Sequence, residues 1–142
     1  MEISTEENEA IVREICELVE RSGKDNKTVE TYQQVVYDID YLLLETNSGA
    51  SFEQYFRWAS IDEIKRIEAA LNTVGLEDIS KLTNQAIQIA FPNGMPKDDD
   101  EKDDLTDWSE DQEESLESLF ETLEESNGRI TNILAEYAKS QA

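Results

Sequence analysis

The chain has 142 residues, of which 34 are Asp or Glu, 12 are Lys or Arg and none is His, so its formal net charge is −22. A surface this acidic repels the phosphates of nucleic acids and the headgroups of anionic membranes. The lack of histidine excludes every mechanism or zinc site that needs an imidazole. With 38% hydrophobic residues, the chain can nevertheless fill a core.

Apolar residues recur every three or four positions along the first two thirds of the chain, which predicts helices. Capping boxes at Ser4–Glu7 and Ser60–Glu63 mark two helix starts. Gly23 and Gly75 are natural helix ends, and Pro92 cannot continue a helix. The predicted helices lie at 4–23, 29–49, 51–58, 60–75 and 76–91. In the third of these, the rings of Phe52, Tyr55, Phe56 and Trp58 are expected to plug the core.

The last third is expected to contain an acidic loop at 97–106, a break or bend at Asn127-Gly128 and a short final helix. Between the loop and the break, a strongly acidic helix is marked by Leu105, Trp108, Leu116, Leu119, Phe120 and Leu123. No stretch alternates with period two, so the fold class is all-α. We predict a single compact domain of six or seven helices over residues 1–142. It consists of a helical core at 1–96, the acidic loop at 97–106 and acidic C-terminal helices at 107–142.

Cys16 is the single cysteine, so no intramolecular disulfide is expected. It lies on an apolar stripe among glutamates, which favours a core residue over a nucleophile. The N-terminus lacks the basic and apolar regions of a signal peptide, and no apolar run approaches the roughly 18 residues that span a bilayer. A cytoplasmic protein with no membrane association is therefore expected.

Negative charge is concentrated in the last third of the chain. Residues 97–142 carry 16 acidic and 4 basic side chains, and 15 of those acidic residues lie between Lys97 and Glu125. Trp108 lies inside this segment. We expect it to anchor the acidic helix on the core, with an exposed interface residue as the alternative.

The acidic run resembles a calcium loop only in part. Counted from Asp99, carboxylates fall at positions 1, 3, 5, 9 and 12 of an EF-hand, but Asp104 replaces the required glycine at position 6 and Glu101 stands at position 3. A solvated loop is the simpler interpretation. The sequence shows no glycine-rich phosphate loop and singles out no carboxylate pair. We therefore expect a non-enzymatic protein without a metal site or cofactor.

The acidic surface is the candidate binding site. Carboxylates four residues apart on a helix rise about 6 Å along its axis, whereas duplex DNA carries one charge per roughly 1.7 Å. One acidic helix is too sparse to imitate DNA, but two or three acidic helix faces or a symmetric dimer approach that density. The candidate partner-binding residues are Asp98, Asp99, Asp100, Glu101, Asp103, Asp104, Asp107, Glu110, Asp111, Glu113, Glu114, Glu117, Glu121 and Glu124.

A turn and two helix ends carry a family resemblance. The chain has Asn47-Ser48-Gly49-Ala50-Ser51-Phe52 followed by Gln54-Tyr55-Phe56, then a helix that ends at Gly75 and another that closes with Phe91-Pro92-Asn93-Gly94. Residues 45–94 thereby resemble the bacterial DNA-mimic protein family of the DMP type, although Ser48 replaces a glycine and two extra residues precede Phe52. The matched residues are core and turn residues, so they transfer no binding site.

The resemblance implies an all-helical homodimer whose acidic surface occupies the DNA-binding face of a transcription factor or similar basic protein. Our leading hypothesis is a non-enzymatic binder that competes with DNA for such a partner and does not bind nucleic acid itself. One alternative is an immunity-type protein that neutralises a basic toxin such as a nuclease. Others are a scaffold whose charge is only solubilising, and a calcium-responsive or enzymatic domain.

Overall fold

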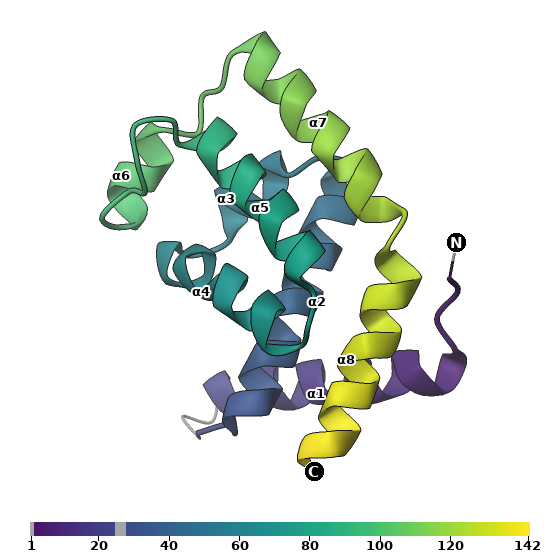
Figure 1. The fold of residues 1–142 in the computed structure, drawn as a ribbon. Coiled ribbons are helices and arrows are strands. Elements are labelled where there is room, and N and C mark those ends of the chain that lie inside the picture. The colour runs from purple at the N-terminus through teal and green to yellow at the C-terminus, as the bar shows by residue number, and fades with distance from the viewer. Residues whose placement is uncertain (1, 25–27) are drawn as a thin grey trace.

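A computed structural model describes residues 2–24 and 28–142, and over these residues the chain is all-helical, with eight α-helices and no strand (Figure 1). All-α is therefore confirmed, with one helix more than the upper expectation of seven. The helices are α1 (Glu6–Lys24), α2 (Thr31–Gly49), α3 (Glu53–Trp58), α4 (Ile61–Thr73), α5 (Glu77–Ala90), α6 (Asp99–Asp104), α7 (Glu110–Glu124) and α8 (Asn127–Gln141).

Helix starts follow local capping signals. At α4 the Ser60 hydroxyl accepts a hydrogen bond from the Glu63 backbone N–H and the Glu63 carboxylate accepts one from the Ser60 backbone N–H, as the capping box predicts. At α1 the prediction is wrong by one residue, because Thr5 Oγ1 accepts from the Asn8 N–H and Ser4 lies outside the helix. The acidic C-terminal helices, expected from residue 107, begin later. Ser109 caps α7, so the helix begins at Glu110.

Helix ends are set by glycine, proline and one unexpected residue. Gly75 has a φ of 83° behind α4, and Pro92 follows α5, as predicted. Helix α1 continues one residue past Gly23 to Lys24. At the end of α2 the left-handed conformation falls on Ala50, with a φ of 53°. The preceding Gly49 is packed so closely on Gln54 that a Cβ there would crowd that side chain.

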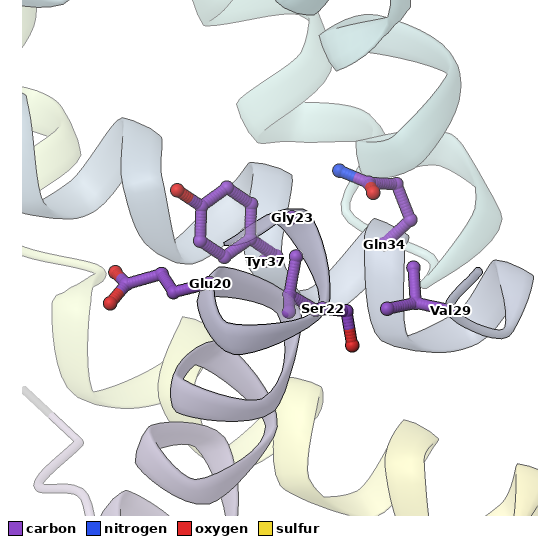
Figure 2. Close-up of a pocket in the computed structure, with 7 residues that line it drawn as sticks. Glu20, Ser22, Gly23, Val29, Gln34 and Tyr37 are labelled. Carbon is purple, nitrogen blue, oxygen red and sulfur yellow. The ribbon is translucent and has the colours of Figure 1, made fainter. Parts of the chain in front are cut away.

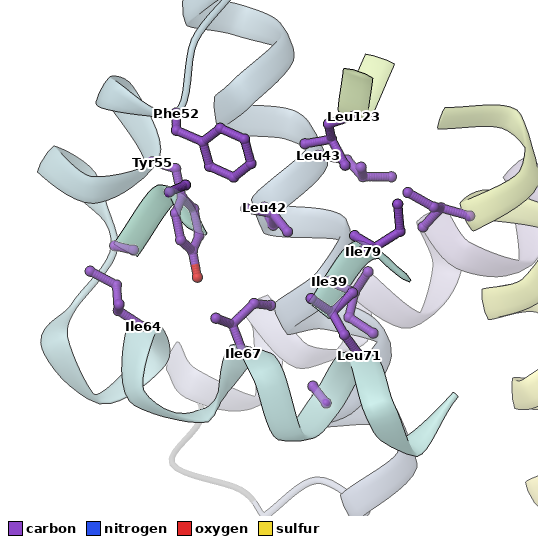
Figure 3. Close-up of a cluster of buried hydrophobic side chains, with 14 of the residues drawn as sticks. Ile39, Leu42, Leu43, Phe52, Tyr55, Ile64, Ile67, Leu71, Ile79 and Leu123 are labelled. Atoms are coloured by element: carbon purple, nitrogen blue, oxygen red, sulfur yellow. The ribbon is translucent and has the colours of Figure 1, made fainter. Parts of the chain in front are cut away.

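Helix α2 is the centre of the fold and packs on α1, α3, α4, α7 and α8. Its residues Ile39, Leu42 and Leu43 point into a cluster completed by the other helices (Figure 3). Phe52, Tyr55 and Phe56 of the α3 segment are buried there, as expected. Trp58 is not: it is 69% exposed. The buried positions of this segment, Phe52, Tyr55, Phe56 and Ala59, recur at steps of three or four residues, and position 58 falls outside that helix face.

Cys16 is partly buried against this core, and its thiol lies 3.4 Å from Oδ2 of Asp40 on α2. Burial, followed by the negative charge of Asp40, raises the pKa of the Cys16 thiol well above its ordinary value. Such a thiol stays protonated, which agrees with a packing residue.

None of the helices within residues 2–24 and 28–142 combines the length and the apolar character that a membrane crossing requires.

Candidate protein-binding surface

The acidic segment begins with a helix where a loop was expected. Residues 99–104 form α6, whose N-cap Asp98 accepts a hydrogen bond from the Glu101 N–H at 2.8 Å. Acidic residues fill the first turn, where the helix dipole favours negative charge. The loop prediction for 97–106 is therefore wrong. A helix of six residues is not stable by itself, so contacts from elsewhere in the chain must hold it.

Those contacts come from Lys102 and Asp99. Lys102 is only 2% exposed, and its ammonium donates hydrogen bonds to the carbonyl oxygens of Phe56 and Arg57, both at 2.8 Å. These carbonyls belong to the C-terminal end of α3, where a cation is favourable. Asp99 Oδ1 accepts a hydrogen bond from the Ile61 N–H at the start of α4, at 2.7 Å. Two long-range contacts thus fasten α6 to the ends of two other helices.

Helix α7 is attached through its own N-terminal residues. Trp108 is 7% exposed and its indole N–H donates to the Ala90 carbonyl at 3.0 Å, while Gln112 Nε2 donates to the Ile89 carbonyl at 2.8 Å. Both acceptors are at the C-terminal end of α5. The expectation that Trp108 anchors the acidic helix is confirmed.

One face of α7 is apolar and the other is acidic. Leu116, Phe120 and Leu123 are buried, mainly against α5. On the opposite side, Glu110, Glu114, Glu117, Glu121 and Glu124 follow one another at steps of three or four residues and are all exposed. At about 1.5 Å per residue these five charges extend over about 21 Å, or roughly 5 Å per charge. A single strand of DNA carries one phosphate per about 3.4 Å.

The other candidate residues lie on or next to α6 and at the start of α7. Twelve of the fourteen predicted residues are exposed, and Glu101 and Glu113 are partly buried. Glu113 lies beside Glu53 of α3. Burial raises the pKa of the Glu53 carboxyl, and the charge of Glu113 contributes in the same direction. The structure does not merge all fourteen residues into one row, because α6 is held by α3 and α4 while α7 lies on α5 (Figure 1).

The cation of this segment is removed from its surface. Between residues 98 and 125 the sequence contains one basic residue, Lys102, and its ammonium is directed into the protein. The exposed positions of α6 and α7 consequently carry carboxylates and uncharged side chains but no cation, although the buried ammonium is still 3.9 Å from Asp103 Oδ1. Sequence reasoning missed this role of Lys102, since its acceptors lie about 45 positions earlier in the chain and leave no local signal.

The described residues do not support the calcium-loop alternative. The stretch counted as an EF-hand loop is helical at 99–104, and no group of three or more metal-ligating side chains gathers within the described residues. A hollow of about 560 Å³ lies between α1 and α2, lined in part by Glu20, Gln34 and Tyr37 (Figure 2). Burial and then the charge of Glu20 raise the pKa of Tyr37, which keeps this phenol protonated.

Comparison with known proteins gives one match. A family model described as DMP19-like protein matches residues 27–141. No curated protein and no solved structure matches the chain.

Proposed function

The chain belongs to the DMP19-like protein family, that of DNA mimic protein 19, and on this premise we propose that it is a non-enzymatic DNA mimic. Its ligand is the DNA-binding surface of a basic protein, such as a transcription factor, and it does not bind nucleic acid. The acidic faces of α6 and α7, with residues 98–124, form the binding surface.

The observation that carries this proposal is that the acidic segment exposes its carboxylates and buries its one cation. Twelve of the candidate carboxylates face solvent, whereas Lys102 is withdrawn into contacts with two carbonyl groups. An exposed Lys102 would place a cation among these carboxylates and repel the Lys and Arg side chains of a partner. A surface of carboxylates without an exposed cation attracts Lys and Arg side chains as a phosphate backbone does, and the attraction weakens with salt.

Charge density supports a dimer as the active form. The α7 row has about 5 Å per charge, which is sparser than one DNA strand and much sparser than a duplex. A second copy related by a dyad adds a second acidic row, as the two strands of a duplex do. We therefore propose that the active form is a homodimer. The cytoplasmic location expected from the sequence is also part of the proposal.

The test is retention of proteins from a cell lysate on the immobilised chain at low and high salt. A DNA-binding protein should be retained at low salt and released by added duplex DNA. The triple variant Glu114→Gln, Glu117→Gln, Glu121→Gln should lose this retention. The matched control Glu14→Gln, Glu17→Gln, Glu20→Gln removes the same charge from exposed positions of α1 and should keep it.

Other outcomes would overturn the proposal. If no DNA-binding protein is retained, or duplex DNA does not compete, the chain is not a DNA mimic. Tight one-to-one retention of a nuclease at high salt would indicate the immunity-type alternative. Equal retention by the α7 variant and the wild type would indicate that the α7 charges are only solubilising.

A further inference from the structure

Trp58 is the largest exposed apolar side chain of the molecule as described, with 69% of its surface in solvent. Its neighbours along the chain are fixed, since Phe56 is fully buried and Ala59 is 1% exposed. The indole is therefore held at a set place on the surface, at the C-terminal end of α3. An exposed large aromatic ring on a rigid frame is a common anchor of protein interfaces.

The contacts of α6 place this acidic helix next to the chain segment that carries Trp58. Lys102 binds the carbonyl of Arg57, the residue before Trp58, and Asp99 binds the N–H of Ile61, three residues after it. Helix α6 thus lies along the segment that carries the indole. Asp103 Oδ1 is 3.9 Å from the Lys102 ammonium that binds the Arg57 carbonyl, and Asp100, next to Asp99 in the chain, is exposed. The exposed Asp62, in the first turn of α4, adds a further carboxylate.

The nearest cation in the sequence is engaged elsewhere. The guanidinium of Arg57 lies over the ring of Trp108, 5.0 Å from its centroid, and Nη2 is 3.4 Å from the Thr106 carbonyl and 3.8 Å from Glu53. The cation–π contact of Arg57 is therefore with Trp108 and not with Trp58. Trp58 keeps an open aromatic face in an acidic neighbourhood.

We propose that Trp58 and the surrounding carboxylates of α6 and α4 form a docking site for an arginine or lysine side chain of a basic protein partner. The cation lies on the indole face while Asp100, Asp103 or Asp62 pairs with its charge. This inference rests on the proposed function and makes it more specific, because it names the residue that anchors the partner. Charge complementarity selects the occupant, since a cation above an aromatic ring is attracted by the ring quadrupole.

The aromatic contact changes how binding depends on salt and on the type of cation. Exposed ion pairs contribute little individually and are screened by salt. A stacked guanidinium retains part of its attraction because the contact is short-range and partly apolar. Binding through Trp58 should therefore favour arginine over lysine and persist to higher salt than binding to α7.

An octa-arginine peptide is the probe, and the indole N–H signals in a ¹H–¹⁵N NMR spectrum are the readout. The chain has two tryptophans, and Trp108 is an internal control because its indole N–H is buried and bonded to Ala90. The Trp58 signal should shift during the titration and the Trp108 signal should not. Octa-lysine should produce a smaller Trp58 shift.

Affinity of the same peptide then tests the residue itself. Trp58→Ala should weaken octa-arginine binding about two- to five-fold, as expected for an exposed cation–π contact, and Trp58→Phe should restore part of it. Leu44→Ala is the matched control, since Leu44 is 60% exposed on α2, and it should leave the affinity unchanged. Asp100→Asn with Asp103→Asn should weaken binding as well.

Several results would overturn the inference. Unchanged affinity in Trp58→Ala, with weaker binding in the α6 or α7 charge variants, would refute the role of Trp58 and leave the proposed function standing. If the charge variants also bind octa-arginine normally, both the role of Trp58 and the proposed function are refuted. If Trp58→Ala instead changes the oligomeric state in sedimentation, the indole belongs to a contact between two copies of the chain.

Discussion

The ammonium nitrogen of Lys102 lies 2.8 Å from the carbonyl oxygen of Phe56, so a residue from the most acidic stretch of the chain caps a helix formed 46 residues earlier. With a second bond to Arg57, this contact removes a positive charge from the acidic surface and fixes α6 on α3. One side chain thereby shapes both the stability and the charge of the candidate site.

Replacement of Lys102 by methionine should lower the free energy of unfolding by about 2 to 3 kcal/mol. Methionine retains the apolar stem but leaves one buried and one partly buried carbonyl without their charged donor. Urea unfolding followed by circular dichroism measures the change. Lys97→Met is the control, because Lys97 is exposed, and its effect should stay within about 0.5 kcal/mol. Equal stability of the two variants would contradict the anchoring role.

Asp38 and Arg66 should behave as a coupled pair. The Asp38 side chain is 3% exposed and accepts from Arg66 Nε at 2.6 Å, Arg66 Nη2 at 2.9 Å and Gln34 Nε2 at 2.8 Å. The hydrogen bonds between Arg66 and Asp38 raise the pKa of the Arg66 guanidinium, while burial acts in the opposite direction. Arg66→Met leaves a buried carboxylate without its cation and should cost about 2 to 4 kcal/mol.

A double-mutant cycle measures this coupling. Asp38→Leu combined with Arg66→Met should cost clearly less than the sum of the single variants, because no unpaired charge remains. Additive single effects would show that the two side chains stabilise the fold independently.

Asp40→Asn should stabilise the protein at neutral pH. Burial raises the pKa of the Asp40 carboxyl, with the hydrogen bond from Cys16 acting in the opposite direction. A carboxyl whose pKa is raised by folding contributes stability below its unfolded pKa and loses that contribution as pH rises through the folded value. The gain from Asn should therefore be small near pH 3.5 and larger at pH 7. Unfolding curves across this range, with the exposed Asp62→Asn as control, test the sign.

The same substitution should make Cys16 more reactive. After burial, the charge of Asp40 is the largest cause of the raised thiol pKa. Asp40→Asn removes that charge, so the thiol should react faster with iodoacetamide at pH 9 than in the wild type. An unchanged labelling rate would show that burial alone protects the thiol.

Gly128→Ala should loosen the N-terminal segment. A Cβ at Gly128, in the first turn of α8, would collide with the backbone oxygen of Glu2 and crowd the N–H of Ser4. Asn132 of the same helix holds that segment by donating to the Ile3 carbonyl at 3.1 Å and accepting from the Thr5 N–H at 3.3 Å. Hydrogen exchange at Thr5 should become faster.

Gly23→Ala is the matched control for this effect. Gly23 is also helical, but no described atom lies within 4 Å of its Cβ position. Alanine there should stabilise the protein by up to about 1 kcal/mol through helix propensity alone. If Gly128→Ala is stabilising to the same degree and Thr5 exchanges normally, the close approach of Glu2 is unimportant.

Sequence patterns predicted the features that depend on near neighbours. The spacing of apolar residues gave the helical class, the Ser60–Glu63 pair gave the start of α4, and Gly75 and Pro92 gave two helix ends. The order of charged residues in the sequence was enough to show that acidic residues are concentrated in the last third of the chain. Each of these depends on residues within about one helical turn of one another, or on charge counts.

The tertiary structure decided which of these side chains face solvent and which helices exist at all. Helix α6 replaces a predicted loop because Lys102 and Asp99 bind backbone groups about 40 positions away. Trp58 is exposed because the face of α3 that packs on the core is formed by Tyr55 and Phe56 and not by position 58. Local periodicity contains no information about such partners, since they become neighbours only when the helices pack. The amount of negative charge follows from the amino-acid sequence, whereas the packing of the helices determines which part of the surface carries that charge.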